Sequence, residues 1–376
     1  MDIKDLETID LKRTKILTPQ ELTKSHTNKS KLNIVYLMIW TQVCGGTKIL
    51  LEYANRIKEK GHNVSIVTYD VKPDWFKLND NVNFIQVPDN EDWKDYIPEC
   101  DVLVATSWRC IYTAIESQKG PVVFFEQGGS HLFEANNISP LKKSTVANRF
   151  KLPHFVYTVS SYAKDVLKDV YDCDSTVIPI AIDNNIFYPR TEPLNNDTIE
   201  ITLVGSEDFK FKNVNNILQA YRILSKKYDN LHLNWITQTQ PQNNKEPAIV
   251  NPPQKMIGDI LRKTHIYICN SEYESFGLPT LEAMTCGATV VTTDTGGMRD
   301  FVKDNYNALV TNHHDINDIV EKVSLLVDNP DLLQKLSTNA MDTAQNFNWE
   351  NSVSKTLSYY NEISKYIVKD NSKSEQ

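Results

Sequence analysis

Two carboxylates flank the start of a predicted helix in the second half of this 376-residue chain. Glu274 lies in a short loop after a strand that ends near Asn270, and Glu282 lies in what the pattern predicts as the first turn of a helix beginning at Pro279. Proline is favoured at a helix start, where unpaired N–H groups carry a partial positive charge. The sequence therefore predicts a phosphate site with a carboxylate on either side.

That combination suits a ligand with both hydroxyls and a diphosphate, and a nucleotide sugar is such a ligand. Carboxylates accept hydrogen bonds from hydroxyls, and Gly277 lets the backbone come close to a ligand. A structural interpretation is open on these residues alone. Glu282 would then only complete an N-terminal cap, and Glu274 would be a solvated loop residue.

Strands and helices alternate around this loop along most of the chain, which predicts parallel sheets built from βαβ units. A polar segment at 183–198, with two prolines, separates two such series. We therefore predict two doubly wound α/β domains, whose ligands bind at the carboxyl ends of the strands. The predicted parts are a polar N-terminal extension with room for one short helix, two domains, and a last helix that packs back on the first domain: 1–30, 31–185, 186–350 and about 351–368.

Composition narrows the class of partner and the compartment. The formal net charge of -8 argues against nucleic acid as the main partner, because phosphate binding needs clustered Lys and Arg. The six cysteines form no CxxC pair and are predicted to be reduced. No apolar run approaches the ~20 residues that span a bilayer, and the N-terminus lacks the apolar core of a signal peptide. We expect a cytoplasmic protein.

The residues between the glutamates resemble a known signature. Glu-Ser-Phe-Gly-Leu-Pro-Thr-Leu-Glu, at 274–282, is similar to that of retaining glycosyltransferases of family 4 (glycosyl transferases group 1), which have the GT-B fold. The resemblance runs from about residue 32 to residue 362. It also includes Ala-Met-Thr-Cys-Gly at 283–287, Asp-Thr-Gly-Gly at 294–297, Ala-Gln-Asn-Phe-Asn-Trp-Glu at 344–350, Gly-Gly at 45–46 and Gly-His-Asn-Val at 61–64.

The resemblance implies an α/β fold of two Rossmann-like domains facing a cleft, with the acceptor on the first and the nucleotide sugar on the second. It implies that Glu282 holds the ribose hydroxyls. Glu274 would contact hydroxyls of the transferred sugar and, with Lys212, would be catalytic. The other donor-binding residues that it implies are Phe276, Gly277, Leu278, Gly45, Gly46, Gly205 and Ser206.

Two departures from the family pattern concern the site. The family commonly has an Arg and then a Lys as a clamp on the diphosphate; here Lys212 takes the Lys position, but Ser206 stands where Arg is usual. Lys210 and Arg262 are candidates to compensate. On its own, Lys212 would also fit a solvated lysine at a helix start.

The second departure follows the strand at 122–125, where many relatives carry a His that approaches the donor sugar. This chain has Glu-Gln-Gly-Gly-Ser-His at 126–131. Either Gln127 takes that place or His131 reaches in from the loop, and a lone His in a polar loop is also commonly solvated. Gln127, Gly128 and His131 are thus candidate contacts to the sugar or the acceptor.

By resemblance, transfer would retain the anomeric configuration through an oxocarbenium-like state, without a carboxylate nucleophile. No cofactor or metal is expected, because zinc-ligand spacing is absent and no Asp-x-Asp follows a strand in the right setting. The donor would be a UDP-, GDP- or dTDP-sugar, and the acceptor a glycan, a lipid-linked molecule or another cell-envelope component.

The acceptor side leaves alternatives open. The region 132–153 contains Lys142, Lys143, Arg149 and Lys151 among apolar residues. It would suit peripheral contact with the inner face of a membrane, or a solvated helix and loop. A non-catalytic GT-B partner subunit that binds a glycan or a sister transferase is the alternative function. An epimerase would lack the paired glutamates, and a phosphorylase would usually be longer.

Overall fold

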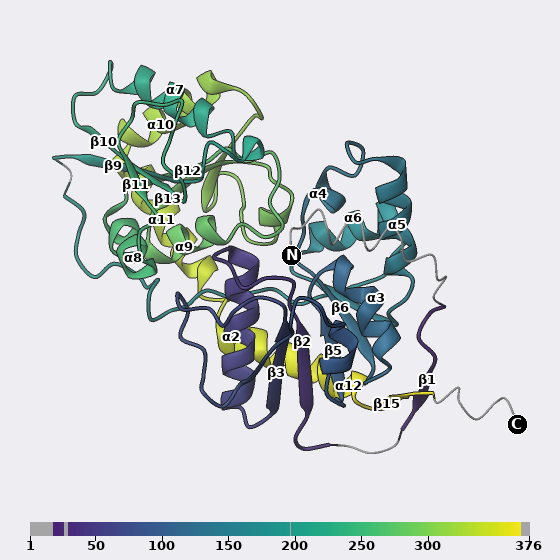
Figure 1. The fold of residues 1–376 in the computed structure, drawn as a ribbon. Helices are drawn as coiled ribbons and strands as arrows, with labels where there is room; N and C mark the ends of the chain where they lie inside the picture. The colour runs from purple at the N-terminus through teal and green to yellow at the C-terminus, as the bar shows by residue number, and fades with distance from the viewer. Residues whose placement is uncertain (1–17, 26–28, 196, 370–376) are drawn as a thin grey trace, which may run out of the picture. The chain divides into compact units, whose positions relative to one another are not determined.

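The structure is a computed structural model that describes residues 18–25, 29–195 and 197–369 (Figure 1). It divides into two compact units. The described residues of unit 1 fall within 18–159, 163–179 and 352–369, and those of unit 2 within 160–162 and 180–351. Each unit has its own parallel sheet and its own hydrophobic core.

Unit 1 is built on a seven-stranded parallel sheet in the order β4-β3-β2-β5-β6-β7-β8. Its central strands are apolar on both faces, as expected where helices cover both sides of a sheet. The strands are β2 (Asn33–Leu37), β3 (Asn63–Thr68), β4 (Asn83–Gln86), β5 (Val102–Ala105), β6 (Val122–Glu126), β7 (Phe155–Thr158) and β8 (Thr176–Val177). The helices are α2 (Gly45–Glu59), η1 (Trp93–Tyr96), α3 (Trp108–Ser117), α4 (Ser130–Phe133), α5 (Pro140–Phe150), α6 (Ser161–Tyr171) and α12 (Trp349–Ile363).

The ends of the chain correct two sequence predictions. The predicted last helix ends at Ile363, and Tyr366–Val368 forms strand β15 instead, because aromatic and β-branched residues favour a strand. It pairs antiparallel with β1 (Leu22–Lys24), so this part of the polar extension is strand. The short helix for which the extension had room is not found at 18–25, and 1–17 and 26–28 lie outside the described residues.

Helix α12 joins unit 1 through a buried tyrosine network. The Tyr360 hydroxyl lies 2.7 Å from that of Tyr157 and 3.3 Å from that of Tyr36. The Tyr53 hydroxyl lies 2.6 Å from that of Ser352. Buried hydroxyls need such partners, so these pairs fix α12 against β2, β7 and α2.

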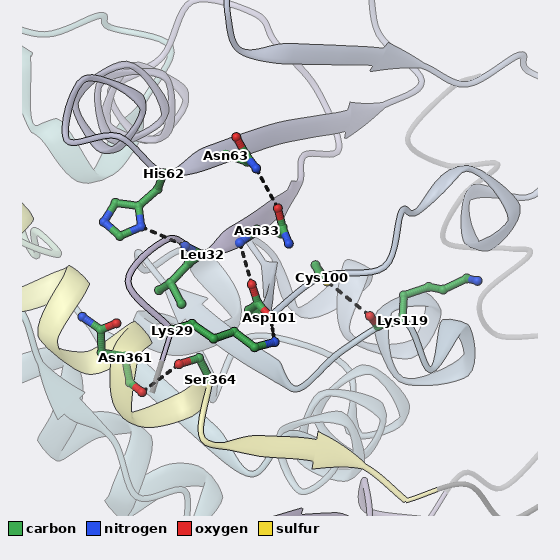
Figure 2. A network of polar contacts seen from close by, with 10 residues as sticks. All are labelled: Lys29, Leu32, Asn33, His62, Asn63, Cys100, Asp101, Lys119, Asn361 and Ser364. Atoms are coloured by element: carbon green, nitrogen blue, oxygen red, sulfur yellow. Dashed lines mark hydrogen bonds and ion pairs between the residues drawn. The ribbon is translucent and has the colours of Figure 1, made fainter. Parts of the chain in front are cut away.

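A second polar network ties together the amino ends of three strands of unit 1 (Figure 2). Asp101, just before β5, is 6% exposed. Its Oδ2 accepts the Asn33 N–H at 2.7 Å, and its Oδ1 pairs with Lys29. His62, before β3, accepts the Leu32 N–H at Nδ1, 3.1 Å away. This network lies at the end of the sheet opposite to the one where ligands bind in such folds.

Unit 2 is built on a six-stranded parallel sheet in the order β11-β10-β9-β12-β13-β14. The short edge strand β11 was not predicted, because it is three residues long and stands in a polar stretch. The strands are β9 (Ile199–Val204), β10 (Leu231–Thr237), β11 (Ala248–Val250), β12 (Ile266–Cys269), β13 (Thr289–Thr293) and β14 (Ala308–Thr311). The helices are η2 (Lys210–Lys212), α7 (Val214–Leu224), α8 (Gln254–Lys263), α9 (Leu278–Cys286), η3 (Gly297–Asp300), α10 (Ile316–Val327) and α11 (Pro330–Ala344).

The first half of the predicted interdomain linker is anchored to unit 2. The backbone oxygen of Ile186 accepts a hydrogen bond from Arg262, at 2.8 Å. Arg190 donates to the Thr264 oxygen at 3.3 Å and to the Ser337 hydroxyl at 2.9 Å. These contacts hold the segment against α8 and α11.

One histidine in each unit, His62 in unit 1 and His265 in unit 2, makes the stability of the fold sensitive to acid. His62 and His265 each accept a backbone N–H at Nδ1, from Leu32 and Glu200 respectively, at 3.1 Å. Burial lowers the pKa of both, with neighbouring cations Lys31 and Arg190 adding to the effect. A lowered folded-state pKa means that the unfolded chain binds more protons, so stability falls as pH drops below the unfolded value of about 6.5.

We therefore expect the melting temperature to fall between pH 6.5 and 5, and to fall less in His265→Asn. The asparagine accepts the same N–H without titrating. Thermal unfolding of both proteins across this pH range is the measurement. Parallel curves for the two proteins would show that His265 does not contribute.

All six cysteines are free thiols, as predicted. Among the helices that the structure describes, none is both long and apolar enough to cross a bilayer.

Candidate active site

The strand order of unit 2 identifies where a ligand would bind. The chain proceeds from β9 outward to β10 and β11 in one direction, and from β12 outward to β13 and β14 in the other. The neighbouring strands β9 and β12 are thus the topological switch point, where open α/β sheets bind ligands at the carboxyl ends of the strands. The loops that leave this point begin at Gly205 and Asn270.

An ion pair joins these two loops. The Lys212 Nζ lies 2.6 Å from the Glu274 Oε1, and the two side chains are 19% and 14% exposed. The Ser271 hydroxyl donates to the same carboxylate oxygen at 2.8 Å. The loops are also joined through the backbone, since the Glu272 N–H donates to the Phe211 oxygen at 2.8 Å. The structure thus brings together the two residues predicted as catalytic.

Lys212 is charged in this setting. Its burial lowers its pKa, but the charge of Glu274 and the hydrogen bond between them raise it, and the net shift is upward. The ammonium is therefore retained over the whole neutral range. A partly buried cation at the carboxyl ends of the strands is suited to a phosphate oxygen.

Helix α9 starts one residue earlier than the sequence predicts. Leu278 is its first residue and Gly277 its N-cap, in the left-handed region at φ 94°. Glu282 is consequently the fifth residue and lies in the second turn, which corrects the predicted first-turn position. The helix ends at Gly287, also left-handed at φ 91°, as predicted. The N–H of Leu278 lies directly after the loop that carries Glu274, whereas Pro279 has no N–H and those of Thr280 and Leu281 donate to the Gly277 oxygen at 3.1 Å.

Phe276 contributes through its backbone position, because its side chain belongs to the core. It is 2% exposed, and its ring contacts those of Phe301 and Phe347, with centroids 5.5 and 5.7 Å away. This aromatic cluster anchors the turn that leads into Gly277 and Leu278. The rings fix the start of the helix relative to the loop.

The Asp-Thr-Gly-Gly turn after β13 holds the backbone of Glu274. The Glu274 N–H donates to the Thr295 oxygen at 3.0 Å, and its own oxygen accepts the Gly297 N–H at 3.2 Å. A Cβ on Gly297 would lie 2.3 Å from the Glu274 oxygen, so only glycine fits. Asp294 is itself fixed by Arg299 through hydrogen bonds of 2.7 to 3.1 Å.

Gly205 and Ser206 lie at the carboxyl end of β9, and the serine is committed to a local network. It is 3% exposed, and its hydroxyl lies 3.0 Å from an Asp208 carboxylate oxygen and 2.7 Å from the Thr239 hydroxyl. Gly205 lets the loop pass close to α7, because a Cβ on this residue would lie 3.2 Å from Cγ2 of Val214. Ser206 therefore acts in shaping the loop that carries Lys212.

Of the two candidates to complete the basic clamp, Arg262 is already engaged. It donates to Ile186 and pairs with Asp259, and its guanidinium lies 3.9 Å from the centroid of the Tyr188 ring. It braces α8 within unit 2. Lys210 is exposed at the start of η2.

In unit 1, Gly45 and Gly46 open helix α2, with Cys44 as its N-cap. A Cβ built on Gly46 would lie 3.5 Å from Nε2 of Gln127, so the Gln127 amide packs against the helix start. Gln127 directly follows β6. Of the two alternatives for this loop, the structure places Gln127 beside the first turn of α2.

His131 points instead into unit 1. It is 8% exposed, and its Nε2 lies 2.8 Å from Oε2 of Glu126. The other oxygen of that carboxylate accepts the Gly128 N–H at 2.5 Å. Glu126 was missed at the sequence level, although an acidic residue at the end of an otherwise apolar strand was a usable signal.

Of the four basic residues predicted to form a surface at 132–153, Arg149 is buried and does not contribute to it. Arg149 is 4% exposed, and its guanidinium lies 5.1 Å from the Trp108 ring centroid and 5.8 Å from that of Tyr112. Lys151 is exposed, and Lys142 and Lys143 are half-buried. Within the described part of the chain, no group of three or more His, Cys, Asp or Glu side chains is arranged to hold a metal ion; metal independence stays a prediction.

Comparison with known proteins finds glycosyltransferases. Residues 186–343 match the family described as Glycosyl transferases group 1. MMP alpha-(1->4)-mannosyltransferase of Mycolicibacterium hassiacum is 25% identical over 56% of this chain and 54% of its own length. D-inositol 3-phosphate glycosyltransferase of Thermobispora bispora is 31% identical over 29% of this chain and 26% of its own length. The matches thus span between about a quarter and half of these relatives, and they support a transferase.

Solved structures match over most of the chain. Sucrose-phosphate synthase from Thermosynechococcus elongatus gives a TM-score of 0.75 at 15% identity, covering 89% of this chain and 99% of that one. Anabaena HepE in complex with UDP-glucose gives 0.73 at 14% identity, covering 87% and 100%. At these identities the likeness concerns the fold. The two Rossmann-like units form a GT-B fold.

Proposed function

We propose that this protein is a retaining glycosyltransferase that moves a sugar from a nucleotide-sugar donor to a glycan, a lipid-linked molecule or another cell-envelope acceptor. The observation that carries the proposal is the Lys212–Glu274 ion pair, 2.6 Å long, at the switch point of unit 2, with Glu274 in the loop that leads into α9. A cation, a carboxylate and a helix N-terminus together suit a ligand that has both phosphates and hydroxyls.

Each group has a distinct role in this proposal. Lys212 and the N–H of Leu278 at the start of α9 would bind the diphosphate and stabilise the negative charge that grows on it as the glycosidic bond breaks. Glu274 would accept hydrogen bonds from the sugar hydroxyls, and Glu282 from the ribose. Gln127, at the start of α2, would contact the sugar or the acceptor. No metal is required for these contacts.

The diphosphate would bind Lys212 without displacing Glu274. The ammonium has three N–H groups, so it can keep the carboxylate and donate to a phosphate oxygen at the same time. The pair would then hold Lys212 ready for the ligand, which reduces the entropy lost on binding.

A thermal-shift panel of UDP-, GDP-, dTDP- and ADP-sugars tests the donor class. A ligand that binds only the folded protein stabilises it by about 2.7 kcal/mol at 100 times its Kd. We expect one nucleotide to raise the melting temperature, and UDP-glucose is the first to try because HepE was solved with it. Lys212→Met should lose that shift, while Lys226→Met, at an exposed lysine just after the far end of α7, should keep it. No shift with any nucleotide would contradict the proposal.

One observation favours the alternative of a non-catalytic partner subunit. Ser206 stands where the resemblance implies arginine, and its buried hydroxyl is committed to Asp208 and Thr239. The diphosphate would then be held with one positive charge fewer. Slow hydrolysis of the stabilising nucleotide sugar separates the two functions: an enzyme releases the nucleotide, whereas a partner subunit binds a glycan without turnover.

A further inference from the structure

The Glu-Gln-Gly-Gly-Ser-His segment after β6 closes on itself through one carboxylate. Glu126 is 3% exposed, and both of its oxygens are used, one by the Gly128 N–H and one by the His131 ring. A carboxylate is costly to bury unless donors satisfy it, and here the donors come from its own loop. The Thr158 hydroxyl also donates to the Glu126 backbone oxygen, at 2.8 Å, which fixes the residue to β7.

The two glycines make this closure possible. Gly128 has φ 91°, a conformation in which a non-glycine residue is strained, and it turns the chain so that its N–H meets the carboxylate. A Cβ on Gly129 would lie 3.1 Å from Nδ1 of His131, so this glycine leaves room for the imidazole ring. The glycines thus serve the Glu126–His131 pair, which we call the loop clamp.

Three elements wall off the loop clamp from solvent. From α6, the Tyr171 hydroxyl donates to the His131 backbone oxygen. Burial, together with the charge of Glu126, raises the pKa of Tyr171 to about 12 and that of Cys173 to about 12. From α3 and α5, the rings of Trp108 and Phe150 lie 6.2 and 6.1 Å from that of His131. The clamp is therefore inaccessible to substrate.

The side chain of Gln127 takes no part in the contacts of the loop clamp. This residue lies between Glu126 and Gly128 in sequence, is half-buried, and packs its amide against Gly46 at the start of α2. Among the described residues, no hydrogen bond from this amide is found, whereas the groups on both sides of it are bonded. An unbonded amide on a fixed backbone beside a helix start is available to a ligand.

We propose that Glu126 and His131 are positioning residues, which hold the 127–131 loop so that Gln127 is presented to the sugar or the acceptor. The inference rests on the proposed function for the identity of the ligand. It adds that the buried pair acts through Gln127 without touching the substrate. Loss of the clamp then affects the chemical step more than donor binding, because the nucleotide is held by unit 2.

Kinetics of Glu126→Ala, Glu126→Gln and Gln127→Ala test the inference, with Asp101→Asn as the matched control. Asp101 is also buried, and its carboxylate accepts the Asn33 N–H and pairs with Lys29 (Figure 2). It lies before β5, at the opposite end of the same sheet from Glu126. A misplaced contact group costs up to about 100-fold in rate. We expect such a loss of kcat in Glu126→Ala, a similar loss in Gln127→Ala, and partial rescue in Glu126→Gln, whose amide oxygen still accepts the Gly128 N–H.

The effects on kcat, on the donor KM and on the melting temperature distinguish a positioning role from general destabilisation. The donor KM should stay within about twofold of wild type in the Glu126 variants, as expected for an interaction that matters in the transition state. Asp101→Asn should lower the melting temperature by as much as Glu126→Gln while keeping kcat. Equal kcat in Glu126→Ala and Asp101→Asn, or full activity in Gln127→Ala, would overturn the inference.

Hydrogen exchange gives a readout that does not depend on activity. In Glu126→Ala the Gly128 amide loses its acceptor, so the peptide that contains 127–131 should exchange faster, while in Asp101→Asn the change should be confined to the region of Asn33. Unchanged exchange at 127–131 would overturn the clamp even in an active enzyme. If the wild-type protein turns over no nucleotide sugar, the proposed function fails, and the exchange result still decides whether the clamp exists.

Discussion

Glu274→Gln is expected to lower turnover of the nucleotide-sugar donor by at least about 100-fold, the size of effect seen when one preorganised group is removed from the charge-developing centre of an active site. The amide has the same shape as the carboxylate. It removes the negative charge that pairs with Lys212 at 2.6 Å and replaces one acceptor oxygen by a donor. Release of free nucleotide, measured with and without acceptor, checks the result.

The substitution should affect activity much more than stability. The Ser271 hydroxyl can still donate to the remaining amide oxygen, and the backbone of residue 274 stays fixed by Thr295 and Gly297. Because both side chains are partly exposed, water replaces part of the lost ion pair. We expect the free energy of unfolding to fall by about 1 to 2 kcal/mol. Urea unfolding of the two proteins provides this control.

Glu272→Gln is the matched variant. It makes the same chemical change two residues earlier in the same loop, at a side chain that is 46% exposed and 3.7 Å from His314. It should retain activity close to that of wild type. Comparable activity in Glu274→Gln and Glu272→Gln would contradict the role proposed for Glu274.

The sequence predicts the strands and helices around the site well, because each produces a local pattern of apolar residues along the chain. The alternation of apolar runs and amphipathic spacing indicates two doubly wound units, and the helix stop at Gly287 is found as predicted. The strand order, and with it the switch point, needs long-range pairing between β9 and β12 that no local pattern specifies. Spacing therefore predicts the loop that carries Glu274, but it does not show that this loop lies next to the loop after β9, which carries Lys212.

The errors in the site have local physical causes. Helix α9 begins at Leu278, one residue before Pro279, because Gly277 is its N-cap in the left-handed region, and this moves Glu282 into the second turn. His131 was considered as a solvated or substrate-facing residue, since a sequence does not show that Glu126 is buried beside it. The strand β15 escaped prediction because its partner β1 is more than 300 residues away in sequence.

Gly277→Ala is expected to be among the most destabilising single substitutions in unit 2, because two penalties act at the same position. Its φ of 94° is strained for any residue with a Cβ. A Cβ there would also lie 2.4 Å from Cγ and 2.7 Å from Sδ of Met298, which is 1% exposed. Strain of this kind costs about 1 to 3 kcal/mol, and overpacking a core adds about 1 to 3 kcal/mol.

Gly61→Ala separates the two penalties. Gly61 has almost the same φ, 95°, but a Cβ there would meet nothing within 4 Å. Its alanine variant should therefore show only the backbone strain, about 1 to 3 kcal/mol. The difference in unfolding free energy between the two variants measures the clash with Met298, and a difference near zero would contradict it.

The double variant Gly277→Ala/Met298→Ala shows whether the same clash is what disturbs the site. Removing the Met298 side chain makes room for the new Cβ, so the double variant should be less destabilised than the sum of the two single variants. If the start of α9 binds the diphosphate, Gly277→Ala should also weaken the donor-induced thermal shift, and Met298→Ala should restore part of it. Additive unfolding energies together with an unchanged thermal shift would show that the Gly277 turn acts neither on packing nor on the donor site.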